Sequence, residues 1–115
     1  MTKTRIYNDW EKVISSLFHN LKKAGFMPFQ VNNGDEDENT PTWKEALSET
    51  TATGEASVYL KHPDTEKLIW LYIVLGNEPE ELVADYSVFE PIEAPLTAFC
   101  AVWEGKKCPT KEVTR

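Results

Sequence analysis

The sequence has few of the residues and patterns that mark the common classes of functional site. Its two cysteines, Cys100 and Cys108, have a spacing that fits neither a CxxC redox pair nor a zinc site. No sequence signal pairs a nucleophile with either histidine, His19 or His62, and the motifs GxSxG, GxGxxG and GxxxxGK(S/T) do not occur. We therefore expect two free thiols, no cofactor and no catalysis.

Long apolar runs and dense basic clusters are also missing. The longest apolar run, LIWLYIVL at 68–75, has eight residues, whereas a membrane-spanning helix needs about 20. The N-terminus has no apolar stretch with a cleavage site, so we expect a cytoplasmic protein without a secretory signal. Direct nucleic-acid binding would need clustered lysine and arginine, and the net charge of −7 argues against it. The candidates for such contact are Lys3, Arg5, Lys12, Lys22 and Lys23.

The sequence does contain enough apolar and aromatic side chains for one folded domain. Its 115 residues are 41% apolar and include four tryptophans, four tyrosines and five phenylalanines. A chain of this length buries roughly two thirds of its unfolded surface in one core. We expect a single domain over residues 1–115, with a loose tail from about residue 107.

Capping patterns and apolar spacing predict four helices. A capping box at Asn8 opens a stretch whose apolar residues recur at intervals of three and four, and Gly25 ends it. A second capping box at Thr42 opens a brief helix. The segment 76–87 could be a strand or a helix, and we expect a helix because a capping box and helical spacing coincide there. A last helix is predicted around 92–105.

Alternating apolar side chains predict three strands. The segment 26–31 is short, and Pro28 places it at a sheet edge because proline cannot donate to a ladder. The segments 55–61 and 67–75 are joined by turn-forming residues and should pair as an antiparallel hairpin. Both alternating sets of 67–75 are apolar, so we expect a central strand with helices covering both of its faces.

Together these elements predict an α+β fold in a single domain. A small antiparallel sheet of about three strands, with 67–75 central, is packed with helices in the order α-β-α-β-β-α-α. In the last helix we expect Cys100 to face the core. The back of that helix carries small residues, which should cover the sheet within the monomer or, alternatively, form a weak homodimer contact. These residues are Ala94, Thr97, Ala98 and Ala101.

The stretch NNGDEDENT at 32–40 has four consecutive carboxylates. Asp35, Asp37 and Asn39 occupy positions one, three and five of a calcium-binding loop. Thr40, however, stands where the sixth position needs glycine for a sharp turn. We therefore expect no metal site, and the segment is either a solvated loop or part of a partner-binding surface.

Negative charge is concentrated in two parts of the chain. Residues 32–60 carry seven carboxylates and one lysine, a net charge of −6, and residues 76–104 carry seven carboxylates without lysine or arginine, a net charge of −7. Acidic surfaces of this kind can steer onto basic clefts of a partner. We expect the two segments to gather into one continuous patch. Its candidate partner-binding residues are Asp35, Glu36, Asp37, Glu38, Glu78, Glu80, Glu81 and Asp85.

This charge distribution favours a small, acidic, non-catalytic module that docks on a basic protein surface, such as that of a nucleic-acid enzyme. Two classes of small acidic protein resemble it in size and charge: inhibitors that imitate DNA, carried by phages and plasmids, and immunity proteins. No sequence motif supports this comparison. We expect neither nucleic acid nor a membrane as a direct partner. The alternative is a small enzyme or small-molecule-binding domain with a pocket beside the central strand, near Trp70, Tyr72 and His62.

Overall fold

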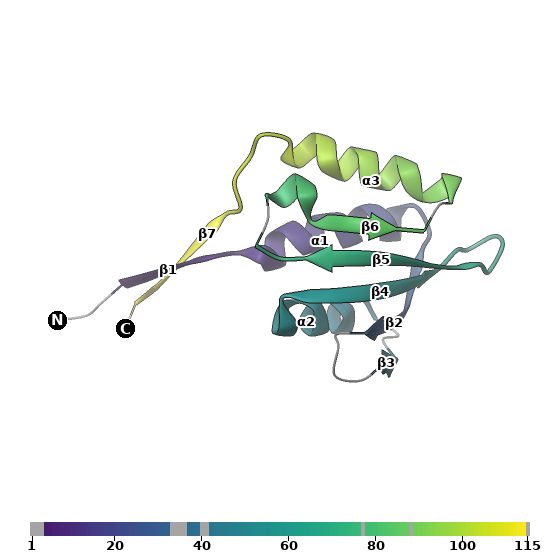
Figure 1. Ribbon diagram of the computed structural model, residues 1–115, viewed down its shortest axis with the longest axis horizontal. Coiled ribbons are helices and arrows are strands. Elements are labelled where there is room, and N and C mark those ends of the chain that lie inside the picture. The colour runs from purple at the N-terminus through teal and green to yellow at the C-terminus, as the bar shows by residue number, and fades with distance from the viewer. Residues whose placement is uncertain (1–3, 33–36, 40–41, 77, 88, 115) are drawn as a thin grey trace.

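A five-stranded antiparallel sheet and three α-helices form the body of the protein, in a computed structural model that describes residues 4–32, 37–39, 42–76, 78–87 and 89–114 (Figure 1). The predicted α+β class is confirmed, with five strands in the sheet rather than about three. The strands lie in the order β3-β2-β4-β5-β6. In chain order the elements are β1 (Thr4–Asn8), α1 (Trp10–Lys23), β2 (Met27–Asn32), β3 (Asp37–Asn39), α2 (Trp43–Thr53), β4 (Glu55–Lys61), β5 (Leu68–Val74), η1 (Pro79–Glu81), β6 (Val83–Tyr86), α3 (Glu90–Trp103) and β7 (Thr110–Thr114).

Helix α1 buries the apolar stripe that its sequence spacing predicts. The helix begins at Trp10, and its N-cap is Asp9, whose side chain makes no capping hydrogen bond; the predicted cap at Asn8 is wrong. Gly25 follows the helix with a φ of +95°, and a Cβ at this position would lie 2.9 Å from Cγ of Pro63. Glycine therefore lets the end of α1 approach the turn after β4 closely. The buried residues of the stripe are Val13, Ile14, Leu17, Phe18 and Leu21.

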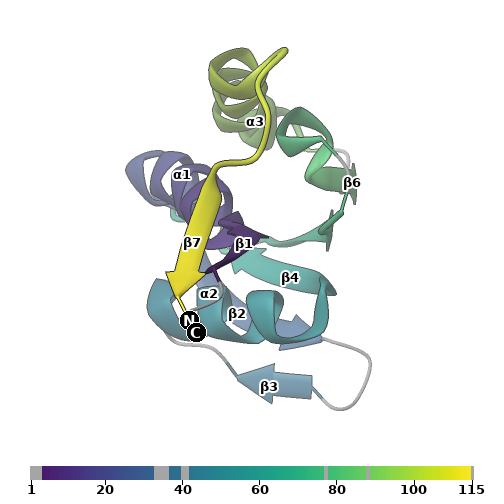
Figure 2. The same ribbon diagram turned by 90° about the vertical axis from the view of Figure 1, so that its left-hand side faces the viewer.

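Strands β4 and β5 form the predicted antiparallel hairpin. One alternating set of each strand is buried, and these side chains lie opposite one another in the register, Val58 against Leu71 for example. They join the buried side chains of α1, α2 and α3 in one hydrophobic core. Figure 2 shows α1 and α3 on one side of β4 and β6. β5 is an interior strand between β4 and β6, and β4 is the middle strand of the five.

The segment predicted as a helix over 76–87 contains a single 3-10 turn, η1, followed by the edge strand β6. Within the turn, the amides of Glu81 and Leu82 donate to the carbonyls of Glu78 and Pro79 at 2.8 and 3.1 Å. The helix prediction is therefore wrong. Forming the first turn of a helix is unfavourable, and only further turns offset that free energy. Here the following residues instead form β6, which gains ladder hydrogen bonds by pairing antiparallel with β5.

Helix α3 lies where the last helix is predicted, but some of its residues that were expected to be buried are exposed. Cys100 is exposed rather than in the core, and its Sγ donates to the carbonyl of Glu80 at 3.5 Å. The small residues at 94, 97, 98 and 101 are exposed, so they do not cover the sheet within the monomer. Among the described residues, no helix is long and apolar enough to cross a membrane.

The two ends of the chain form a second, two-stranded sheet. β1 pairs antiparallel with β7, which lies in the segment that we expected to be a loose tail. The amide of Asp9 donates to the carbonyl of Pro109 at 2.6 Å, which fixes the point where the ribbon leaves the body. Figure 1 shows the ribbon projecting from the body. The longest dimension of the molecule is accordingly 57 Å, against 32 and 20 Å for the other two.

Candidate functional site

The face of the sheet that points away from the hydrophobic core, which we call the open face, is the candidate functional site. Its side chains belong to the alternating set of each strand that the core does not include. Residues paired across neighbouring strands lie side by side, so the register orders them in rows. From the β4–β5 turn onward the rows are Met27, Lys61 and Leu68; Gln30, Tyr59 and Trp70; Asn32, Ser57, Tyr72 and Asp85; and Glu55 with Val74.

The centre of the open face is apolar. Strand β5 places Leu68, Trp70, Tyr72 and Val74 there, at every second position. Leu68 is 49% exposed, and Trp70, Tyr72 and Val74 are partly buried. Met27, on the far side of Lys61 in the same row, is 58% exposed. The expectation that helices cover both faces of this strand is therefore wrong. Apolar side chains that remain accessible to solvent and are rimmed by polar ones are typical of interaction surfaces.

Hydrogen bonds hold the open face in place around Trp70 and Tyr72. The amide of Trp70 donates to Oγ of Ser87 at 2.9 Å, and the amide of Ser87 donates to the Trp70 carbonyl at 3.0 Å. The hydroxyl of Tyr72 donates to Oε2 of Glu55 at 2.7 Å. This hydrogen bond, helped by desolvation and by the Glu55 charge, raises the pKa of Tyr72. Tyr72 therefore stays a neutral hydrogen-bond donor at physiological pH.

The predicted acidic residues that the structure describes belong to opposite ends of the strand order and do not gather at one place. Asp37 and Glu38 belong to β3 at one edge, and Asp85 belongs to β6 at the other. Four strand spacings of about 4.8 Å separate the two edge strands. Before β6, around η1, Glu78 and Glu81 are exposed and Glu80 is partly buried. Asp35 and Glu36 lie outside the described residues.

The strand order therefore contradicts the single patch that we expected, but it places the two acidic segments on either side of the open face. Asp85 lies on the open face itself, in the row of Tyr72. Lys61, the lysine on this face, forms an ion pair with Glu66 at 3.7 Å. The open face thus combines the apolar side chains of β5 with the carboxylates of Glu55 and Asp85 on the two neighbouring strands.

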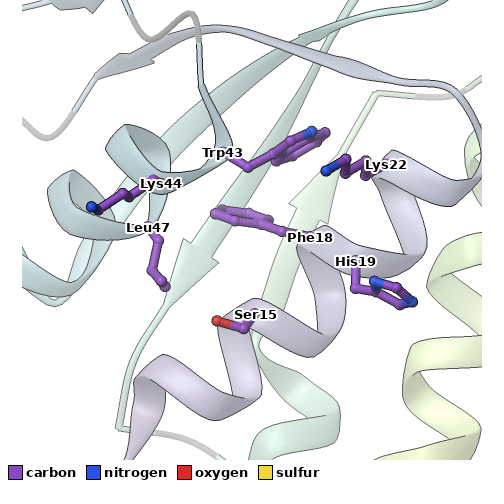
Figure 3. A pocket seen from close by; sticks show the side chains of 7 residues that line it. All are labelled: Ser15, Phe18, His19, Lys22, Trp43, Lys44 and Leu47. Atoms are coloured by element: carbon purple, nitrogen blue, oxygen red, sulfur yellow. The ribbon is translucent and has the colours of Figure 1, made fainter.

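The residues expected around a pocket beside the central strand do not converge. His62 is only 8% exposed, and its ring makes edge contacts with Phe26 at 5.3 Å and Phe89 at 5.0 Å. Its Nδ1 accepts a hydrogen bond from the amide of Thr65 at 3.3 Å. His62 thus closes the β4–β5 turn and packs against Phe26 of the core, whereas Trp70 lies on the open face. A pocket does occur elsewhere, between α1 and α2 (Figure 3).

Other chemistry has little support among the described residues. None of their histidines, cysteines and carboxylates form a group of three that could hold a metal ion. Both thiols are free, and burial raises the pKa of Cys100 and of Cys108, which lowers the fraction of reactive thiolate. The sequence did not indicate Met27 of β2 or Tyr59 of β4 as functional residues. The available signal was strand β5, whose two alternating sets are both apolar and which could therefore have one face left for a partner.

Comparison with protein-family models, with curated proteins and with solved structures finds no match to this chain.

Proposed function

We propose that the protein is a non-catalytic, cytoplasmic protein-binding module whose open face docks on a basic surface of a partner protein. The observation that carries the proposal is the second apolar set of β5, which the chain's own helices leave uncovered. Covering Leu68 and Trp70 with a partner would remove their apolar surface from water. At about 25 cal/mol per Å² this is the main favourable term in protein association.

Charge argues for a basic partner. Glu55 and Asp85 lie on the open face, Asp37 and Glu38 belong to the edge strand β3, and Lys61 is already engaged by Glu66. A partner with arginine and lysine around an apolar centre would complement this arrangement, and long-range attraction would raise its association rate. A second copy of this chain is a poorer partner, because Glu55 and Asp85 of each open face would bring like charges together.

Aromatic side chains on a sheet also serve RNA-binding domains, where bases stack on them. Such surfaces need lysine or arginine along the path of the phosphates. The open face has Glu55 and Asp85 instead. A nucleic-acid partner is therefore disfavoured. Imitation of DNA is disfavoured as well, because β3 and β6, which carry residues of the two acidic segments, are the opposite edge strands of the sheet. The proposed module is therefore not a DNA-mimicking inhibitor.

The test is capture of partners from a lysate of the source organism, followed by binding measurements with the purified partner. Trp70→Ala should weaken binding at least tenfold, as expected for a central aromatic anchor. Val102→Ser is the control, because Val102 is an apolar side chain that is 50% exposed but lies on α3, away from the open face. Raising the salt from about 50 to about 500 mM should slow association with the partner.

The proposal requires that the captured protein is basic and that its cross-links reach β4 and β5. It is wrong if the Trp70 variant binds as tightly as the unsubstituted protein, or if RNA or DNA is the species captured. Sedimentation should show a monomer at high micromolar concentration. A dimer that Trp70→Ala dissociates would assign the open face to self-association and would contradict a separate partner.

A further inference from the structure

A pocket of about 270 Å³ lies between α1 and α2, on the helical side of the molecule and apart from the open face. Its floor is aromatic, because the rings of Phe18 and Trp43 lie 5.2 Å apart at a tilt of 44°. Leu47 lines the same pocket, and Trp43 and Leu47 are only partly buried. Figure 3 shows the two rings in the space between the helices. The apolar part of the pocket is therefore preformed and open to solvent.

Basic side chains surround this aromatic floor. Lys22 extends from α1 toward the ring of Trp43, while His19 and Lys44 lie at the rim and point away from the rings (Figure 3). Of the residues described as lining the pocket, none is acidic. The ion pairs in the described part of the chain involve other lysines. Both pocket lysines are thus available to an anion, in a protein with a net charge of −7.

The position of Lys44 is unfavourable for the helix alone. It lies in the first turn of α2, next to the N-cap Thr42, whose side chain accepts from the Glu45 amide at 3.2 Å. The N-terminal end of a helix carries partial positive charge, so a lysine there is less favourable than a neutral residue. An anion in the pocket would reverse this penalty, because the dipole and both lysines would then attract it.

We propose that this pocket binds a small organic anion, an aromatic compound with one carboxylate. Its ring would lie against Trp43 and Phe18, and its carboxylate would pair with Lys22 in the pocket. Lys44 has a flexible four-carbon stem and would swing in from the rim as the second cation. A volume of about 270 Å³ is at the small end for ligand sites, which suits a bicyclic ring system and excludes larger cofactors.

The experiment uses three probes that share the indole ring system and differ in the charge of the side chain. Indole-3-acetate is the anion, indole-3-acetamide is neutral, and tryptamine is a cation. Titrations of the full chain are followed by amide chemical shifts in two-dimensional NMR. The acetate should bind about tenfold more tightly than the acetamide, in line with a charge-assisted hydrogen bond, and tryptamine should bind most weakly. The shifted amides should belong to α1 and the first turn of α2.

Variants separate charge from shape. Lys22→Gln should weaken the acetate about tenfold and leave the acetamide within twofold, and Lys44→Gln should have a smaller effect in the same direction. Lys23→Gln is the matched control, since Lys23 is the next residue, is exposed and does not line the pocket. It should bind all probes unchanged.

Three outcomes would overturn the inference: equal affinity for the acetate and the acetamide, no shifts at millimolar acetate, or equal losses in the variants of Lys22 and Lys23. Trp70→Ala changes the open face alone and should bind the acetate normally. The proposal for the pocket and the proposal for the open face can therefore be refuted independently.

Discussion

The two faces of strand β5 have similar apolar side chains but different surroundings. On the covered face, Leu71 has no exposed surface and packs within a core that three helices share. On the open face of the same strand, Leu68 is 49% exposed and does not belong to that core. The difference teaches that apolar alternation determines which side chains share a face, while the rest of the fold decides whether that face is covered.

The cause of this asymmetry is the segment before α3. The sequence predicts a fourth helix in this segment, as the two-sided apolar pattern of β5 would require. Residues Val83–Tyr86 extend the sheet instead, as an edge strand. Its inward residues Val83 and Tyr86 pack against the same core as the helices. All described covering elements therefore lie on one side, and the apolar set of β5 on the other side is left for a partner.

The largest expected effect is on stability, from the same substitution placed on the two faces. Leu71→Ala should lower the free energy of unfolding by about 2–5 kcal/mol, because it removes fully buried methyl groups and leaves a cavity. Leu68→Ala should lower it by about 1 kcal/mol or less, since about half of that side chain is already in water. Urea unfolding of both variants measures the difference. Equal losses would mean that the open face is buried in the folded monomer.

A second, smaller effect is expected where the hairpin turn meets the core. His62→Ala should lower the free energy of unfolding by about 1–3 kcal/mol, because two aromatic edge contacts, each worth about 0.5–1.5 kcal/mol, are lost. His19→Ala, at the exposed histidine of α1, is the control and should change stability by about 0.5 kcal/mol or less. If His62→Ala changes the free energy of unfolding no more than His19→Ala does, the His62 ring does not stabilise the turn.

The smallest effect concerns the hydrogen bond on the open face. Because Glu55 raises the folded-state pKa of Tyr72, the folded protein holds this proton more tightly than the unfolded chain. The resulting stabilisation is fully present below the unfolded pKa of about 10 and is lost as pH rises through the folded pKa. Glu55→Gln should lower the pKa of Tyr72, measured by the ring-carbon shift in an alkaline NMR titration. An unchanged titration would show that the hydrogen bond does not form in solution.

Much of the fold could be predicted from local patterns. The stripe of α1, the cap of α2 at Thr42 and the β4–β5 hairpin depend on spacing, side-chain capping and turn residues, all of which act within a few residues. Several local predictions failed. The cap at Asn8 is wrong, and β2 lies between β3 and β4 although Pro28 predicted an edge strand. The capping pattern before β6 was too short to nucleate a helix, and Cys100 lies just outside the buried stripe of α3.

The candidate sites were less accessible to sequence reasoning, because they combine residues distant in the chain. The open face joins Met27 to Leu68 through the register of three strands. The pocket joins Lys22 to Lys44 through the packing of α1 on α2. Neither pairing leaves a spacing pattern in the sequence. The acidic segments were visible as composition, but their separation by three strands depends on the strand order.

The sequence by itself determined the α+β class, the hairpin and the two apolar faces of β5, since side-chain direction in a strand follows from a period of two residues. Only the tertiary structure decided which of those faces meets water and where the acidic segments lie. The reason is that strand order and helix placement depend on long-range packing, which minimises exposed apolar area over the whole chain. In this chain the available helices suffice for one face of the sheet.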